Sequence, residues 1–164
     1  MSDPAGGAVS DGGTKTLVVL RHAKAAHVPG LADPERPLTG RGERDAREAG
    51  DLIRPLGPGL VLSSPSVRTR RTAELLGLAV PTEIERDIYE AYADELLGLL
   101  RRTDPEVDVL VLVGHNPGVH ELVMDLTGAD VEGFPPGSFA VVEAPAPWEE
   151  IGPRTGQLVR VHRP

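Results

Sequence analysis

The sequence of 164 residues contains no cysteine. Disulfide frameworks, thiolate nucleophiles, zinc fingers and iron–sulfur clusters are therefore excluded. Aromatic residues make up only 3% of the chain, too few for the row of stacking platforms that binds single-stranded nucleic acid. The longest apolar run covers residues 109–113, whereas a membrane-spanning helix needs about 20 apolar residues. These absences point to a globular protein that does not span a membrane.

The chain is acidic, with a formal net charge of −8. This charge disfavours binding to nucleic acid or to an acidic membrane surface, so any anion must be bound by a local basic cluster. Residues 1–14 are small and polar and predict a disordered tail. They have neither the basic start nor the apolar segment of a secretory signal, so we expect a cytoplasmic protein. Residues 15–164 have the length of one domain, which we expect to be a monomer.

Three aliphatic runs have the character of strands buried on both faces of a parallel sheet, namely 16–20, 60–62 and 107–113. Apolar residues at helical spacing lie between and after these runs, around 46–53, 96–100 and 119–126. A short strand is expected near 83–85. The alternation predicts an α/β fold, a three-layer sandwich with a mostly parallel central sheet. Two further strands, 138–143 and 157–162, are expected to form an antiparallel C-terminal hairpin.

Helix boundaries are marked by capping residues. Ser64-Pro65 and Asn116-Pro117 each place a capping side chain before a proline, which predicts helix starts at these points. Gly77 and Gly128 stand where helices are expected to end.

Basic side chains follow the predicted strands where each of them ends. Arg21 and His22 come after the first strand, Arg68 opens the helix after the second, and His115 comes after the fourth. Because ligands of a parallel sheet collect at the carboxyl ends of its strands, these residues are expected at one edge. Arginine forks match phosphate oxygens, and a neutral imidazole can attack phosphorus to give a phosphohistidine that water then hydrolyses. The pattern indicates phosphate chemistry without a metal or another cofactor.

At these residues the sequence resembles the histidine phosphatase (phosphoglycerate mutase-like) superfamily, and most closely its SixA-type phosphohistidine phosphatase branch. The resemblance implies the phosphoglycerate mutase-like fold. It implies that His22 is the nucleophile, that Arg21 and Arg68 clamp phosphate, and that His115 binds a phosphate oxygen and stabilises the transition state. Glu90 is a candidate for the general acid of the mutase-type members. The segments that carry the resemblance are LVVLRHAKA (17–25), DPERPLTGRG (33–42), LSSPSVRTRRTAE (62–74), IYEA (88–91) and LVGHNPG (112–118).

Several neighbouring residues allow two interpretations. Helix positions two apart diverge, so at most two of Arg68, Arg70 and Arg71 can face one site. Arg68 is the expected one, and Arg70 and Arg71 are solvent-facing or dock the substrate. Lys24 extends the positive rim or is a surface lysine. Asp33 and Arg36 form a structural salt bridge or contact substrate. Ser63 and Ser64 lack the surroundings of a serine nucleophile, so capping is the better interpretation. The remaining histidines, His27, His120 and His162, show no metal-ligand spacing.

The leading hypothesis is a metal-independent phosphatase that forms a phosphohistidine intermediate. Few residues separate the second predicted helix from the fourth strand, so we expect an uncovered site that suits phosphohistidine on a protein. One alternative is a phosphatase of small phosphomonoesters in the same superfamily. Another is a catalytically silent module that only binds phosphate.

Overall fold

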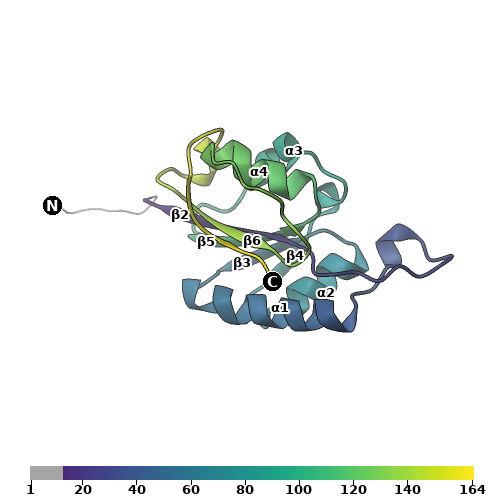
Figure 1. Ribbon diagram of the computed structural model, residues 1–164. Helices are drawn as coiled ribbons and strands as arrows, with labels where there is room; N and C mark the ends of the chain where they lie inside the picture. The colour runs from purple at the N-terminus through teal and green to yellow at the C-terminus, as the bar shows by residue number, and fades with distance from the viewer. Residues whose placement is uncertain (1–12) are drawn as a thin grey trace.

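The computed structural model describes residues 13–164, and the predicted tail lies outside this range except for its last two residues. A six-stranded sheet lies between two layers of helices (Figure 1). The strands are β2 (Lys15–Arg21), β3 (Leu60–Ser63), β4 (Thr82–Ile84), β5 (Val109–Gly114), β6 (Phe139–Ala144) and β7 (Gln157–His162). The α-helices are α1 (Gly40–Ile53), α2 (Val67–Leu75), α3 (Ala93–Leu100) and α4 (Gly118–Thr127), and single 3-10 turns include η1 (Asp33–Glu35), η3 (Arg86–Ile88) and η4 (Trp148–Glu150).

The strand order is β4-β3-β5-β2-β6-β7. The first four of these strands are parallel to one another, as expected for strands joined through helices. Strand β6 pairs antiparallel with β2, and β7 pairs antiparallel with β6. The three-layer α/β class and the antiparallel C-terminal hairpin at the end of the sheet are both confirmed.

The central strands β2, β3 and β5 are buried on both faces, which explains why they are continuous aliphatic runs. Along β2, Val18 and Leu20 pack with α1 and α2, whereas Leu17 and Val19 pack with α3 and α4. Figure 1 shows these two helix pairs on opposite sides of the sheet. Trp148 of η4 closes the α4 side, and its indole nitrogen donates to the Val107 carbonyl oxygen at 2.6 Å.

Two predicted helix starts were wrong, and the two predicted ends were right. Helix α2 begins at Val67 and is capped by Ser66, whose hydroxyl accepts from the Thr69 amide. Helix α4 begins at Gly118 without a side-chain cap. The hydroxyl of Ser64 and the amide of Asn116 are used elsewhere, as described below. Gly77 and Gly128 follow α2 and α4 with positive φ. No helix within residues 13–164 is both long enough and apolar enough to cross a bilayer.

The close approach of α1 to the end of α2 depends on a missing side chain. A Cβ at Gly50 would collide with the backbone carbonyl of Leu76, which also accepts a hydrogen bond from Arg54 Nη2 at 3.0 Å. In contrast, a Cβ at Gly98 in α3 would meet no atom within 4 Å. Replacing each glycine by alanine therefore tests a different effect on stability: close packing at Gly50 and helix propensity at Gly98.

We predict that Gly50→Ala lowers the free energy of unfolding by about 1–3 kcal/mol, because backbone segments must separate to admit the methyl group. Alanine is the better helix former by about 1 kcal/mol, so Gly98→Ala should instead stabilise the protein. Urea denaturation of both variants beside the wild type measures the two changes. A Gly50→Ala protein as stable as the wild type would show that this contact does not limit the packing of α1.

Candidate functional site

The carboxyl ends of two adjacent parallel strands bring the two site histidines together. His22 follows β2 and His115 follows β5, and their ring centroids are 5.4 Å apart. The His22 amide donates to the Gly114 carbonyl oxygen at 3.0 Å, which fixes this spacing through the backbone. Both rings face a hollow of about 430 Å³, lined by Arg21, His22, Lys24, Ala25, His27, Arg36, Arg68, His115, Asn116 and Pro136.

The His22 ring is held in the tautomer that a nucleophile needs. Its Nδ1 lies 2.8 Å from the Ala23 carbonyl oxygen. Because a carbonyl only accepts, Nδ1 carries the proton and Nε2 keeps a lone pair. Burial, together with the charges of Arg68 and Arg21, lowers the pKa of His22 from 6.5 to about 4. The ring is therefore neutral at pH 7.

His115 lies between Ser64 and Arg68. Its Nε2 is 2.8 Å from the Ser64 hydroxyl, and its Nδ1 is 3.4 Å from Arg68 Nη2. A guanidinium only donates, so Nδ1 accepts and Nε2–H donates to Ser64. Burial, then His22 and Arg68, lower the pKa of His115 to about 3. The Tyr89 ring stands edge-on to this imidazole, with the centroids 5.2 Å apart.

Two arginines flank the histidines. Arg68 is only 6% exposed, although it carries a full charge. Arg21 Nη1 donates to the Phe134 carbonyl oxygen at 3.1 Å. Burial and the nearby Arg68 lower the pKa of Arg21. The Nε–H groups of both arginines are buried without a partner among the described residues. Two neighbouring cations with unpaired donors form a site that is complementary to an anion.

Asp33 of η1 compensates the buried charge of Arg68. Its backbone oxygen accepts from Arg68 Nη1 at 2.8 Å, and its carboxylate accepts from Nη2 at 3.0 Å. The same carboxylate accepts from the Tyr89 hydroxyl and from Arg36. These donors, with Tyr89 contributing most, hold the pKa of Asp33 well below its usual range. Asp33 is therefore an ionised structural partner of Arg36 and Arg68 and cannot donate a proton near pH 7.

The structure does not bring Glu90 to the hollow. This residue is exposed, has a left-handed backbone with φ of 59°, and borders a separate depression with Arg86, Asp87 and Arg102. The sequence placed it by its linear position after the third predicted strand, but η3 turns its side chain elsewhere. None of the residues that line the hollow is a carboxylate.

The other basic residues divide between the site and the surface. Lys24 and His27 line the hollow. Arg70 and Arg71 point away from it: Arg70 is exposed and donates to the Pro65 carbonyl oxygen, and Arg71 pairs with Glu74 at 2.6 Å.

The two remaining histidines have structural contacts. His120 Nε2 lies 2.6 Å from the Val131 carbonyl oxygen and its ring stacks on Phe134, while His162 packs on Phe139. Within residues 13–164, no three His, Asp or Glu side chains are grouped so that they could hold a metal ion.

The contacts of Ser64 and Asn116 differ from those predicted from the sequence. Ser64, interpreted as a helix cap, accepts from His115, and its own amide donates to the Val113 carbonyl oxygen at 3.3 Å. Asn116 donates to the Phe134 carbonyl oxygen at 2.8 Å, the same atom that Arg21 uses. A signal was available, because Ser64 and His115 each follow one of two neighbouring parallel strands.

Comparison with known proteins agrees with this geometry. Residues 17–108 match the family model of the histidine phosphatase superfamily, branch 1. An uncharacterized protein of Mycobacterium tuberculosis is 32% identical over 157 residues, which cover 88% of this chain and 99% of that protein.

Solved structures with the same architecture include two proteins described as candidate SixA phosphohistidine phosphatases. The one from Nakamurella multipartitia has a TM-score of 0.85 at 27% identity, covering 94% of this chain and 99% of the other. The one from Agrobacterium tumefaciens has a TM-score of 0.78 at 29% identity, covering 92% and 99%. The chain therefore belongs to the histidine phosphatase superfamily.

Proposed function

We propose that this protein is a metal-independent phosphatase that transfers phosphate to His22 Nε2 and acts on phosphohistidine of a protein. One observation carries the proposal. A neutral imidazole with a free Nε2 lies beside two arginines, in a hollow whose lining contains no carboxylic acid. Such a site can attack phosphorus, but it offers no carboxyl proton to a leaving alkoxide.

Phosphate binding rests on Arg21 and Arg68. Both residues line the hollow, and their planar guanidinium groups match the oxygens of a phosphate. A bound dianion would also favour the charged form of His115. Protonation at Nδ1 would end its hydrogen bond from Arg68 and make this nitrogen a donor, while Nε2–H remains on Ser64.

In the first chemical step His22 Nε2 forms a bond to phosphorus as the bond to the substrate nitrogen breaks. The substrate ring, protonated on its second nitrogen, takes back the bonding electron pair and leaves as a neutral imidazole. No further proton is needed. An alkyl phosphate would release an alkoxide that must be protonated in the transition state.

In the second step water attacks the phosphorus of phosphorylated His22. The Ala23 carbonyl keeps a proton on Nδ1, so the phosphorylated ring is a cation and departs as a neutral imidazole. The water proton passes to the solvent, and inorganic phosphate is released. The Arg21 and Arg68 charges stabilise the equatorial oxygens in both steps.

We predict that His22→Asn lowers the turnover of a peptide carrying one chemically phosphorylated histidine by at least 10³-fold, because the nucleophile is removed. The measurement is phosphate release with EDTA present, where the wild type should remain active. Wild-type enzyme quenched during turnover should carry an acid-labile, base-stable phosphate that the variant lacks.

His162→Asn is the matched control for the loss of an imidazole, because His162 packs on Phe139 away from the hollow. It should keep both turnover and labelling. Wild-type activity in His22→Asn would reject the mechanism. Binding of phosphorylated peptide by the wild type without any release of phosphate would favour the silent binding module.

We predict that His22 and His115 remain neutral at pH 5.5, since burial lowers their pKa values to about 4 and about 3. An imidazole with the ordinary pKa of about 6.5 would be roughly 90% protonated at that pH. Ring carbon and proton chemical shifts, assigned with His22→Gln and His115→Gln, report the two forms. Titration of either ring near pH 6.5 would contradict the electrostatics described here.

We predict that the leaving group decides catalytic efficiency. The value of kcat/KM should be at least 100-fold higher for N-phosphoimidazole than for a sugar phosphate, because only the sugar phosphate needs an acid to protonate its leaving group. Glu90→Gln should change both rates by less than twofold, since Glu90 lies outside the hollow. Steady-state kinetics measure the four values. A preference for a sugar phosphate that disappears in Glu90→Gln would establish the small-molecule phosphomonoesterase with Glu90 as its acid.

A further inference from the structure

We propose that the loop of residues 24–38, called here the rim loop, is a docking surface for an acidic and apolar segment next to the phosphohistidine of the substrate protein. This inference rests on the proposed function and adds the chemistry of the partner. Three features carry it: the charge of the hollow, the fixed position of the loop, and the apolar residues at its tip.

The hollow contains more positive charge than a phosphate group uses. Arg21 and Arg68 suffice to clamp a phosphate, yet Lys24 and Arg36 also line the hollow. Asp33 offsets one of these four charges through its bridges to Arg36 and Arg68. The lining of the hollow is thus positive in a chain whose net charge is −8, whereas residues 24–38 taken alone are neutral, because Asp33 and Glu35 balance Lys24 and Arg36. A positive lining attracts acidic side chains and steers them toward the site.

The rim loop is held in place by the rest of the structure. Its two stems are paired, since the Ala26 amide donates to the Pro37 carbonyl oxygen at 2.8 Å and the Thr39 amide donates to the Lys24 carbonyl oxygen at 2.9 Å. Arg36 Nε reaches across the loop to the Ala26 carbonyl oxygen at 3.0 Å. A surface ordered in advance loses little conformational entropy when a partner binds.

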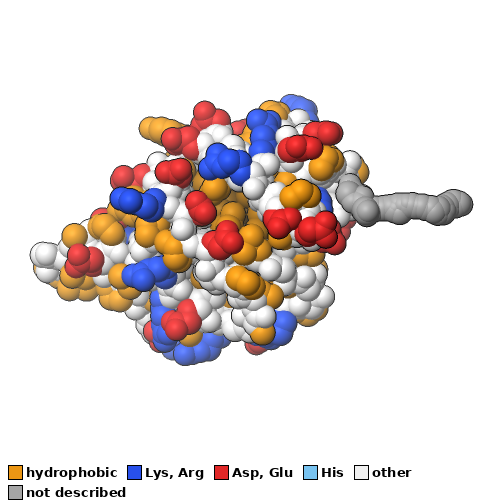
Figure 2. Space-filling model, turned by 180° about the vertical axis from the view of Figure 1, so that it is seen from behind, with side chains coloured by type: hydrophobic (Ala, Val, Ile, Leu, Met, Phe, Trp, Pro, Cys, Tyr) orange, Lys and Arg blue, Asp and Glu red, His pale blue; other side chains and the backbone are white. Residues whose placement is uncertain are grey.

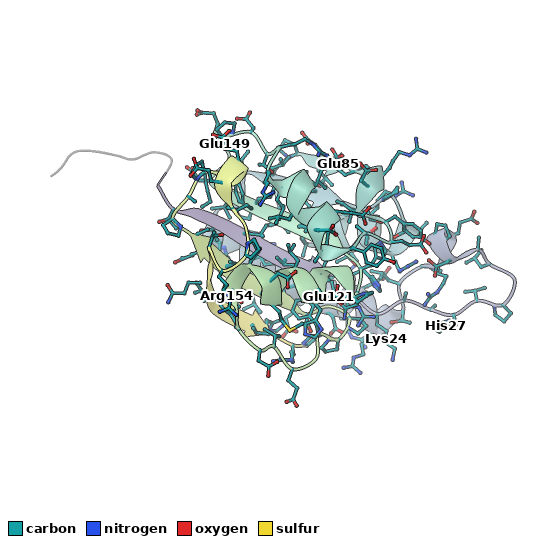
Figure 3. All side chains as sticks on the ribbon, turned by 90° about the horizontal axis from the view of Figure 1, so that it is seen from above. Lys24, His27, Glu85, Glu121, Glu149 and Arg154 are labelled. Atoms are coloured by element: carbon teal, nitrogen blue, oxygen red, sulfur yellow. The ribbon has the colours of Figure 1, made fainter. Side chains whose placement is uncertain are left out.

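The loop projects beyond the body of the protein, ahead of α1 (Figure 1). In Figure 3, Lys24 lies near the body and His27 lies farther out along the same loop. Val28 and Leu31 near the tip are 44% and 37% exposed, and Figure 2 shows apolar side chains along the projection. Neither residue lines the hollow, so a small molecule held there is not expected to need them. A protein segment that leaves the hollow along the rim loop would pass Lys24 and Arg36 and then the apolar tip.

The experiment compares three substrates. Two synthetic peptides of equal length carry one chemically phosphorylated histidine and one leucine, with glutamates around the histidine in the first and lysines in the second. N-phosphoimidazole is the third. We expect kcat/KM to be at least tenfold higher for the acidic peptide than for the basic one, and this preference to shrink as salt rises from 50 to 500 mM.

Lys24→Glu should lower the ratio of kcat/KM for the acidic peptide to kcat/KM for N-phosphoimidazole at least tenfold. Leu31→Ser should lower the same ratio about threefold or more, because it removes the apolar contact. Arg154→Glu makes the same charge change at the other end of the molecule from Lys24 (Figure 3) and should leave the ratio unchanged.

The outcomes separate this inference from the proposed function. If the wild type hydrolyses none of the three substrates, the proposed function fails. If it hydrolyses all three, but both peptides equally well, or if Lys24→Glu behaves like Arg154→Glu, the docking surface is wrong while the phosphatase stands. A small sugar bisphosphate whose hydrolysis depends on Lys24 as strongly as the acidic peptide does would assign the rim to a small substrate instead.

Discussion

The site depends on β5 lying between β2 and β3, parallel to both. This pairing places the residue after each strand at one edge of the sheet, so that His22, Ser64 and His115 meet without any local sequence relation. Backbone hydrogen bonds from the His22 amide to the Gly114 carbonyl oxygen and from the Ser64 amide to the Val113 carbonyl oxygen continue the ladder past the strand ends. The backbone of the site is therefore hydrogen-bonded directly to the centre of the sheet, which is buried on both faces.

The second constraint is the burial of charge next to two neutral imidazoles. A buried guanidinium without a partner would be strongly destabilising, and the Asp33 carboxylate compensates that of Arg68. Burial, together with the charges of Arg68 and Arg21, lowers the pKa of His22 and keeps its ring unprotonated at pH 7. Only the unprotonated ring could act as a nucleophile. One set of charges thus helps to keep the proposed nucleophile neutral and provides the attraction for the phosphate that it is proposed to bind. Because Asp33 is on the rim loop, the shape of that loop and the position of Arg68 are coupled.

The proposed substrate has a leaving group that is itself an imidazole. The proposed transfer runs from one histidine nitrogen to another, and both rings can depart as neutral species. The lining of the hollow, which has cations and imidazoles but no carboxylic acid, is consistent with this symmetry. The tip of the rim loop lies outside the hollow, where a phosphate group alone would not reach it. Its exposed apolar residues are proposed to contact the protein around the phosphohistidine.

The sequence by itself determined the layered fold and most of the site. Continuous aliphatic runs identify strands buried on both faces, and the residues that follow such strands meet at one edge, so Arg21, His22, Arg68 and His115 could be brought together from linear order alone. Tertiary structure decided the rest. Ser64 became the partner of His115 instead of a helix cap, because β3 lies beside β5 and its hydroxyl faces a ring nitrogen that must donate. Glu90 lies outside the hollow, because the turn η3 and the left-handed backbone at Glu90 lead its side chain to a separate depression. Asp33 was an open alternative, because local spacing did not show that Arg68, 35 positions along the chain, would lie against it. Periodicity reports burial along one segment, whereas these three positions depend on contacts between segments that only the folded chain brings together.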